Sequence, residues 1–330
     1  MSALLNKRLA RSLWRSKLRL FAVIFMVSVG VFAGLTFGGY SHNLSGMYDT
    51  MHADDDDGAN LADLWIDNRS TTWSAEQVAN FCQHLTDNWD LSAHDLDSCE
   101  GRNIIPGAMF FDDNGEDRII NSLWHGIAPT ANSDRVWMPD GHSGGRLAVA
   151  DDEIVIDAHV MEPLELNLGD TITIGAGSSS AEFTIVGYGY HPVHIFMAPE
   201  GSVFPPEAGE YVVGYLSESG MARLTGNDLG ASNTVLLDVQ GTPSFDLPDT
   251  NEYEGNEIDA IKLQVEDSLT ATQLDARQRD RGQNEQVEIM RQDLEASKRM
   301  ATPFTVMIAA IAAITIILSL QRLVQSQAKE

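Results

Sequence analysis

The histidines are the first residues that could do chemistry, and their spacing does not build a catalytic or metal site. His191 and His194 are separated by only two residues, and a zinc site needs more ligands within reach than this pair supplies. We interpret the two as loop or core residues. His125 and His142 each lie next to a glycine, which is typical of turns.

The acidic residues are numerous and evenly spread, so no pair of carboxylates stands out as a general acid and base. The run 112–115, Asp-Asp-Asn-Gly, resembles the start of a calcium loop but lacks the later ligands and the closing glutamate. It is typical of a hairpin turn. The sequence contains no phosphate loop ending in Lys-Ser or Lys-Thr. We therefore predict a non-enzymatic chain without a metal, without a cofactor and unable to hydrolyse ATP by itself.

The only cysteines of the chain are Cys82 and Cys99. Two cysteines alone make no convincing zinc site, whereas an oxidising compartment would allow them to form a disulfide. A disulfide that closes a loop of this length would be worth about 3 kcal/mol. We favour the disulfide, with two buried thiols as the alternative.

The elements that must position these residues begin with two long apolar runs. Leu20–Tyr48 and Ala301–Gln321 contain no Asp, Glu, Lys or Arg. The hydrocarbon core of a bilayer is about 30 Å thick and is crossed by about 20 apolar helical residues. We therefore predict transmembrane helices over residues 20–40 and 302–320. A cleaved signal peptide would have a shorter apolar stretch of about 7–15 residues, and a buried core helix would keep a polar face.

Basic residues before the first run set the predicted orientation. Residues 1–19 contain no acid, and the positive-inside rule places this basic end in the cytoplasm. Two spans return the C-terminus to the same side, so the segment between them lies outside the cell. The predicted localisation is the cell membrane, with both termini cytoplasmic. The topology determinants are Lys7, Arg8, Arg11, Arg15, Lys17 and Arg19.

The segment between the predicted spans is strongly acidic. The whole chain has a formal net charge of −27, and residues 40–301 contain 47 acidic and 13 basic side chains. A field of this sign excludes nucleic acid as a partner. We favour a hydrated carboxylate surface suited to a saline environment, and binding of a cationic ligand is the alternative.

Residue patterns in this segment predict an α+β domain. A strand at 61–67 is followed by a helix that Ser74 caps, with Gln77 three residues later. Two strands, 107–111 and 118–123, form a hairpin. The part from about 145 to 240 is β-rich, with predicted strands at 153–156, 171–174, 182–187, 212–216 and 234–239. The last predicted strand covers 261–265.

Helical spacing of apolar residues predicts a stalk on each side of this domain. One stalk extends the first span over residues 41–52, and the other covers 268–301 and leads into the second span. The apolar seam of the second stalk consists of Val287, Met290 and Leu294.

The predicted fold class is an α+β membrane protein with two transmembrane helices and helical stalks that flank a β-rich extracytoplasmic domain. The predicted divisions are a basic cytoplasmic lead-in helix at 1–19, a span at 20–40, a stalk at 41–52, the extracytoplasmic domain at 53–267, a stalk helix at 268–301, a span at 302–320 and a cytoplasmic end at 321–330.

This order of features resembles the permease subunits of MacB/FtsX/LolC-type ABC transporters. Asn6–Arg19 resembles the family's lead-in helix, Asp152–Gly187 its MacB-like periplasmic core domain, and Leu320–Glu330 the start of its FtsX-like coupling region. A family permease continues with a coupling helix and two more spans. Because this sequence stops at Glu330, we expect a truncated gene, a fragment or one half of a split permease.

Three residues carry the core-domain signature in this resemblance. Gly169 and Asp170 begin a Gly-Asp-Thr turn, and Gly187 ends the returning strand of the hairpin that follows. The likeness covers essentially the whole chain through the order of its motifs.

The resemblance also implies a mechanism and partners. A separate cytoplasmic ABC ATPase dimer would bind ATP and move the cytoplasmic ends, and the stalks would carry that motion to the external domain. The implied roles are export, lipoprotein release or mechanotransmission. The implied partners are the ATPase dimer, a second permease copy or homologue, the lipid bilayer, and an extracytoplasmic cargo or effector.

A second hypothesis comes from another functional class. The chain could be a two-span, membrane-anchored ligand-binding or sensor protein without transport activity. An adjacent gene for an ATPase with a phosphate loop would favour the permease over this alternative. A membrane-anchored hydrolase is disfavoured because no nucleophile and base are arranged together.

Overall fold

The computed structural model describes residues 17–52, 58–69, 71–91, 95–113, 116–138, 144–195, 197–199, 201–202, 206–240 and 256–327. The predicted lead-in helix 1–19 lies outside this part of the chain, apart from its last three residues. The chain divides into two compact units. One comprises residues 1–46 and 292–330, and the other comprises residues 47–291.

Six strands of the second unit close into a ring. Their order around the ring is β2-β3-β7-β4-β6-β5, and β5 pairs again with β2. Most neighbours are antiparallel, whereas β3 with β7 and β4 with β6 are parallel. The strands are β2 (Leu96–Asp113), β3 (Glu116–Gly126), β4 (Glu153–Asp157), β5 (Thr171–Ala176), β6 (Ser179–Gly189) and β7 (Tyr211–Leu216).

Apolar side chains from all six strands form one buried cluster, together with residues of two short helices, α4 (Ala158–Met161) and α5 (Glu218–Thr225). Trp124 is fully buried there, and its indole Nε1 donates to the carbonyl oxygen of Gly175, 3.0 Å away. Burial of this apolar surface is the main stabilising contribution to the ring.

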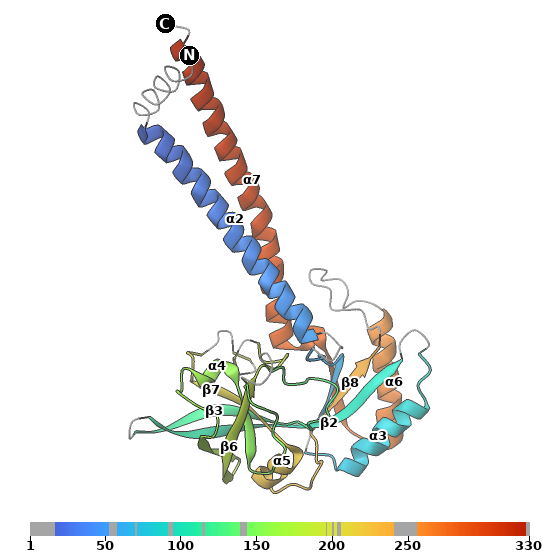
Figure 1. Ribbon diagram of the computed structural model, residues 1–330. Helices are drawn as coiled ribbons and strands as arrows, with labels where there is room; N and C mark the ends of the chain where they lie inside the picture. Colours follow the sequence, from blue (N-terminus) through green and yellow to red (C-terminus); the bar gives the residue numbers. More distant parts are fainter. Residues whose placement is uncertain are drawn as a thin grey trace. The chain divides into compact units, whose positions relative to one another are not determined.

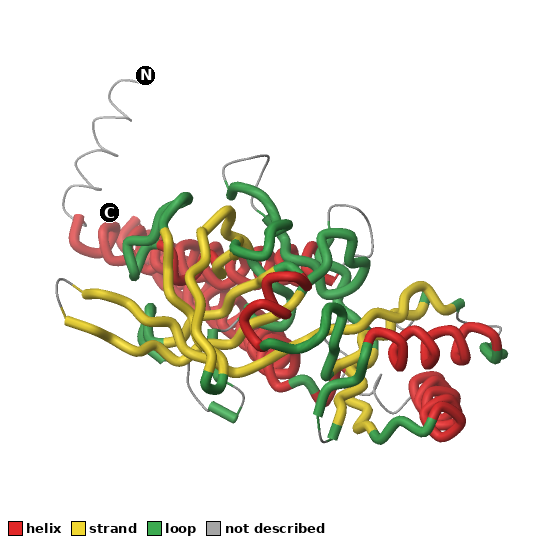
Figure 2. Tube along the Cα trace, turned by 90° about the horizontal axis from the view of Figure 1, so that it is seen from below, coloured by secondary structure: helices red, strands yellow, loops and turns green. Residues whose placement is uncertain are grey.

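A four-stranded antiparallel sheet forms the other half of the second unit. Its order is β9-β1-β8-β2, with β1 at Leu64–Asn68, β8 at Thr234–Val239 and β9 at Ala276–Asp280. Two helices, α3 (Ala75–Asp87) and α6 (Asn256–Thr272), pack on it through one apolar cluster. Figure 1 shows α3 and α6 beside β2 and β8, and in Figure 2 the two helices lie next to strands, at the right of the view.

The long strand β2 belongs to both halves. Its first part pairs with β8 as far as Arg102, and its second part pairs with β3 from Asn103 onward. The ring and the four-stranded sheet are therefore joined through one continuous backbone (Figure 1).

The first unit holds most of two long helices, α2 (Lys17–His52) and α7 (Glu285–Gln327). Gly30 of α2 lies against Ile308 of α7, because a Cβ atom added to Gly30 would come within 2.1 Å of Ile308 Cγ2. The glycine therefore allows the two backbones to approach closely.

The predicted spans 20–40 and 302–320 fall within α2 and α7. In the part of the chain that the structure describes, no helix meets the combined length and apolarity needed to cross a membrane. The two transmembrane helices remain predictions.

Most predicted strands correspond to observed ones, and Ser74 caps α3 as expected. Its side chain accepts from the backbone N–H of Gln77, and the Gln77 side chain accepts from the backbone N–H of Ser74. This reciprocal capping box satisfies two N–H groups at the start of the helix.

Three sequence interpretations differ from the structure. Residues 261–265 were predicted as a strand but lie in α6, where Ile261, Val265 and Leu269 are buried on one face at helical spacing. The stalk helix predicted over 268–301 is interrupted, because α6 ends at Thr272 and the strand β9 intervenes before α7. β9 is polar, Ala-Arg-Gln-Arg-Asp, so apolar periodicity does not reveal it. The third difference concerns His125, which lies in the strand β3 although a turn was predicted there.

Candidate functional site at the roots of the two long helices

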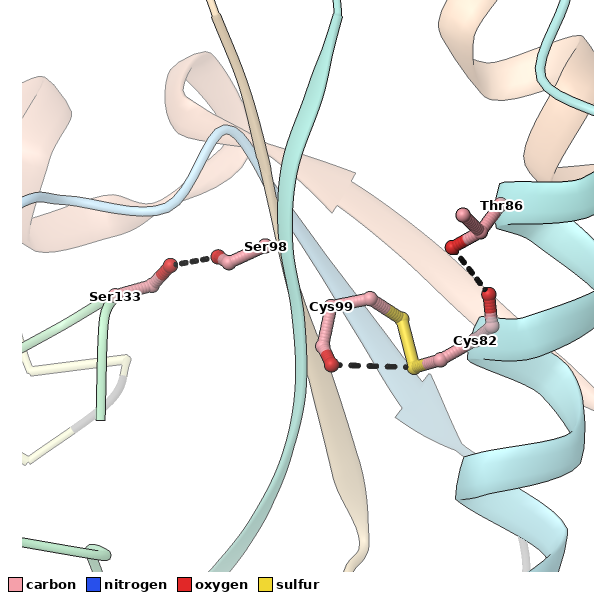
Figure 3. Close-up of a disulfide and its surroundings, with 5 residues drawn as sticks. All are labelled: Cys82, Thr86, Ser98, Cys99 and Ser133. Carbon is pink, nitrogen blue, oxygen red and sulfur yellow. Dashed lines mark hydrogen bonds between the residues drawn. A yellow bond between two sulfur atoms is a disulfide. The ribbon is translucent and has the colours of Figure 1, made fainter. Parts of the chain in front are cut away.

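The predicted cysteine pair lies in the four-stranded half. Cys82 of α3 and Cys99 of β2 are joined by a disulfide, with their Cα atoms 5.7 Å apart. Successive residues of a strand point to opposite faces, so the neighbouring Ser98 points away from α3. Its hydroxyl lies 2.6 Å from that of Ser133 (Figure 3). Both faces of this part of β2 are thereby attached to other segments.

The core-domain signature residues form a turn and a close contact in the ring. Gly169 has φ +92°, a conformation that favours glycine, and its N–H donates to Ile185, 2.8 Å away. The Asp170 carboxylate accepts from the backbone N–H of Asn167 at 2.8 Å. A Cβ atom on Gly187 would come within 2.3 Å of the Arg146 carbonyl oxygen. These residues have structural roles and bring no reactive groups together.

The apolar seam of the second stalk lies in the first three turns of α7. Val287, Met290 and Leu294 are all buried. The spacing found in the sequence therefore marks the inward face of the helix. Of the topology determinants, Lys17 and Arg19 lie in the first turn of α2, and the other four are outside the described residues.

Among the described residues, a hydrogen-bonded polar assembly lies between α2 and β1 and directly before α7. We call residues 58–63 and 280–284 the root segments. β1 begins directly after the first root segment, and β9 ends within the second. β1 and β9 are antiparallel neighbours, and their register places Leu64 opposite Asp280. The two roots therefore converge on one pair of facing residues at the edge of the sheet.

Arg281 joins the two root segments. Its guanidinium donates to the carbonyl oxygens of Leu61 and Ala62, the second at 3.1 Å, and lies 3.1 Å from a carboxylate oxygen of Asp63. The Asp63 side chain is 2% exposed, and the Arg281 side chain is 12% exposed. A buried ion pair with several hydrogen bonds of this kind loses much free energy when one partner is removed.

Asp238 of β8 shares this buried environment. Its carboxylate accepts from the side-chain amide of Asn60 at 2.9 Å, while Asp63 accepts from the backbone N–H of Val239 at 2.9 Å. Burial, together with the nearby charge of Asp63, raises the pKa of Asp238 to about 7, although the Asn60 hydrogen bond and the charge of Arg281 oppose the rise. One carboxyl group of this assembly therefore changes charge near neutral pH.

A second buried acid holds the first root segment from the other side. Asp134 accepts from the Ala62 backbone N–H and from the Trp65 indole N–H, both at 2.9 Å. Burial raises the pKa of Asp134, and these hydrogen bonds and the charge of Arg102 oppose the rise. Asn60 and Asp134 both have positive φ, 47° and 46°, a conformation that asparagine and aspartate tolerate better than most residues. The local backbone is thus held in an uncommon shape by its polar contacts.

None of these residues is predicted as a site residue from the sequence. A signal for them exists: Asp238 interrupts the apolar strand Thr-Val-Leu-Leu-Asp-Val, and Asp63 directly precedes Leu-Trp-Ile. A charged residue inside an apolar strand must be paired once it is buried. The partner, Arg281, could not be named because more than 200 residues separate it from Asp63 in the chain.

The arrangement joins the two root segments through hydrogen bonds and an ion pair. Within the described residues, no group of three His, Cys, Asp or Glu side chains is placed to hold a metal ion. Two cavities of the described residues are small: one is lined mainly by apolar groups, and the other also includes Asn103, Glu218 and Asp228.

No protein-family model and no curated protein matches the chain. The chain is similar to the periplasmic region of MacB from Actinobacillus actinomycetemcomitans, with 12% identity, a TM-score of 0.39, and coverage of 70% of this chain and 92% of that one. It is also similar to the extracellular domain of the noncanonic ABC-type transporter YknZ from Gram-positive bacteria, with 10% identity, a TM-score of 0.35 and coverage of 66% and 98%. A domain of a permease protein from Porphyromonas gingivalis gives 12% identity, a TM-score of 0.28 and coverage of 66% and 85%. Values this low assign neither a family nor a function.

Proposed function

We propose that this chain is a non-catalytic transmembrane subunit of a MacB/FtsX/LolC-type ABC transporter. In this proposal residues 20–40 and 302–320 span the cell membrane, both termini are cytoplasmic, and the region between the spans is extracytoplasmic. A separate ATPase dimer binds and hydrolyses ATP. The chain converts the motion of its two spans into a rearrangement of the external region, which acts on a cargo or effector outside the cell.

The observation that carries the proposal is the convergence of the two roots on the Leu64–Asp280 pair. A mechanical signal needs attachment points that do not yield when the helices move. Here one root continues into β1 and the other follows β9, and these strands are hydrogen-bonded neighbours. A relative movement of the two helices would therefore load the backbone of one sheet directly.

Arg281 supports this role as a positioning residue. By binding two carbonyl oxygens of the opposite root and the Asp63 carboxylate, it resists separation of the roots before the strand pairs are strained. The disulfide between α3 and β2 supports an extracytoplasmic location for this region, because such bonds persist in oxidising compartments.

The partners follow from the same proposal. They are the cytoplasmic ATPase dimer, a second permease copy or homologue, the lipid bilayer, and a lipoprotein, peptide, small amphiphile or envelope enzyme on the outside. The strongly negative charge of the region between the spans disfavours nucleic acid.

The test is reconstitution with the ATPase encoded by a neighbouring gene. We expect the chain to co-purify with that ATPase from membranes and to change its turnover. Arg281→Ala should weaken the change in turnover while leaving co-purification intact, because the ATPase contact lies on the cytoplasmic side. Arg281→Lys, which keeps the charge, should have a smaller effect, and Arg69→Ala, which removes an exposed pair with Asp275, should have none.

If the chain neither binds such an ATPase nor alters its turnover, the transporter proposal is wrong, and a two-span binding protein becomes the better interpretation. We call the contacts of Arg281 with Leu61, Ala62 and Asp63 the root junction. If binding and turnover are normal in Arg281→Ala, the transporter proposal stands and the role given to the root junction is wrong.

A further inference from the structure

Three histidines from distant parts of the chain meet in a second buried assembly, on the outer face of the ring. His125 lies on β3, and the loop after β6 brings His191 and His194 against it. All three side chains are buried, with 1–6% exposure. Their ring centroids lie 4.8–5.3 Å apart. We call these residues the histidine cluster.

The hydrogen bonds in the histidine cluster require at least two of its ring nitrogens to lack a proton. His125 Nε2 and His194 Nε2 are 2.8 Å apart, so one nitrogen must donate and the other must accept. His191 Nδ1 accepts from the backbone N–H of Val193 at 3.2 Å, which a protonated Nδ1 could not do. Among the described residues, His191 Nε2 and His194 Nδ1 are buried without a hydrogen-bond partner. A proton added to the cluster would therefore break an existing bond or create an unsatisfied buried donor.

The surrounding groups offset such a charge only in part. Tyr215 of β7 stacks on His191 with centroids 5.4 Å apart, and its hydroxyl donates to Asp157 of β4 at 2.9 Å. His159 also contacts the Asp157 carboxylate, with Nδ1 at 2.7 Å. The remaining charged group that acts on the cluster is Arg102 of β2.

Burial lowers the pKa of each histidine in the cluster. The pKa of His194 falls to about 4, although the Asp157 charge opposes the change. The pKa values of His125 and His191 fall well below 6.5, and the charges of neighbouring histidines and of Arg102 lower them further. The same burial raises the pKa of Tyr215 well above its usual range, so this phenol supplies no charge near neutral pH.

The loop that carries two of these histidines also reaches the first turn of α7. We call the described residues between Tyr190 and Ser202 the strap. At one end, the backbone of Tyr190 pairs with that of Trp137, with both N–H···O distances at 2.8 Å. At the other end, Gln286 of α7 donates to the Ala198 carbonyl oxygen at 3.3 Å, and Glu285 accepts from the Gly201 N–H at 2.7 Å.

We propose that the histidine cluster is an acid-sensitive latch that holds the strap on β3 and β7 and releases it when the histidines become charged. No described group of side chains is placed to hold a metal here, so protonation is the chemistry open to the cluster. Release would also remove the contacts of Ala198 and Gly201 with the start of α7. The latch goes beyond the transporter proposal and needs no ATPase to operate.

The direction of the pH effect follows from the lowered pKa values. Above pH 6.5 the histidines are neutral in both the closed and the released strap. Below pH 6.5 the released strap binds protons that the closed strap excludes, so closure weakens progressively down to the pKa of the closed state, about 4 for His194. Each histidine contributes up to about tenfold per pH unit to the closing equilibrium in this window.

The test is hydrogen exchange of the purified full chain in detergent between pH 7.5 and 4.5, with rates corrected for the intrinsic pH dependence. We expect peptides from the strap and from the first turn of α7 to lose protection together below pH 6.5, by at least about tenfold at pH 5. Peptides from α3 and β8 should keep their protection. The transition should be steeper than that of a single group, because more than one histidine is charged.

Two variants separate the latch from general acid unfolding. In the double variant His191→Phe and His194→Gln, neither replacement takes up a proton, and the strap should stay protected at pH 5. His84→Gln, which changes a half-buried histidine of α3, should behave like the unmodified chain. Equal loss of strap protection at pH 5 in the double variant and in the unmodified chain would overturn the latch.

A second measurement, on the unmodified chain, tests the proposal even if the double variant does not fold. Nitrogen chemical shifts of the histidine rings in the unmodified chain report each titration directly. We expect the three cluster histidines to remain neutral until the strap exchanges. An imidazole of the cluster that titrates near pH 6.5 while the strap stays protected would also overturn the proposal.

Discussion

The four-stranded sheet and the six-stranded ring bury polar groups in opposite ways. In the sheet, the root junction pairs the charges of Asp63 and Arg281 and adds a covalent link between Cys82 and Cys99. In the ring, the histidine cluster stays neutral and leaves two ring nitrogens without partners among the described residues. The root junction pairs its charges, whereas the histidine cluster is neutral, although both halves share the strand β2.

This difference gives the two halves opposite responses to pH. The raised pKa of Asp238 means that the folded sheet binds a proton more readily than the unfolded chain does. The stability that Asp238 contributes is therefore present at low pH and is lost as pH rises through about 7. The lowered pKa values of the histidines mean that the ring is most stable above pH 6.5 and loses stability on acidification. Near-neutral pH is therefore where both halves retain part of their polar stabilisation.

The largest expected effect comes from removing the cation of the root junction. Arg281→Ala leaves Asp63 buried without its ion pair and should lower the free energy of unfolding by about 3–5 kcal/mol. Denaturant unfolding of the full chain in detergent, followed by tryptophan fluorescence, measures the change. Arg69→Ala, at an exposed pair with Asp275, should cost about 0–1 kcal/mol. Equal losses in the two variants would show that the junction stabilises no more than a surface ion pair does.

Breaking the disulfide should have the next largest effect on the sheet. The double variant Cys82→Ala and Cys99→Ala should lower the free energy of unfolding by about 3 kcal/mol, because the unfolded chain is no longer closed into a loop. The same fluorescence experiment, with and without a reductant, checks this. The reductant should destabilise the unmodified chain and leave the double variant unchanged. Stability that does not depend on the reductant in the unmodified chain would contradict the expectation.

A smaller effect on stability isolates the contribution of the proton on Asp238 from that of its hydrogen bond. Asp238→Asn removes the group whose pKa is raised to about 7, while an amide can keep a hydrogen bond to Asn60. The unmodified chain should lose on the order of 2 kcal/mol between pH 5 and pH 8 from this group, and the variant should not. Unfolding curves at the two pH values measure the difference. An identical pH dependence of stability in both chains would show that Asp238 does not cause the pH response of the sheet.

The smallest effect lies in the ring. His194→Gln keeps a donor and an acceptor near His125 but takes up no proton. It should therefore reduce the loss of stability between pH 7 and pH 5 by about 1–2 kcal/mol. Thermal or denaturant unfolding at both pH values tests this, and His84→Gln is the matched control. A larger loss of stability between pH 7 and pH 5 in His194→Gln than in the unmodified chain would contradict the neutral state assigned to the cluster.

The elements with strong local signals could be predicted from sequence. Ser74 and Gln77 marked the start of α3, and the alternating apolar residues of 171–187 marked the hairpin of β5 and β6. Elements without such a signal were missed. β9 is polar and becomes a strand only because β1 supplies its partner, and the first part of β2 contains Asp97, Ser98 and Glu100, which break any apolar pattern.

The sites show the same limit. Cys82 and Cys99 could be paired from sequence because the chain has no other cysteine. The histidines at 191 and 194 were correctly interpreted as loop residues that become buried. His125 was placed in a turn because of Gly126, whereas it is the strand residue that completes the cluster. Its partners lie more than 60 residues away, which no local pattern reveals.

The sequence by itself determined two long uncharged segments, a basic start, an acidic middle and the apolar periodicity of most strands and helices. These are local properties, set by side-chain chemistry over a few turns or strand residues. Only the tertiary structure decided which distant residues meet: Arg281 with Asp63, and His125 with His194. The physical reason is that a buried charge or an imidazole is constrained by the groups that surround it in space, and those groups come from strands far apart in the chain.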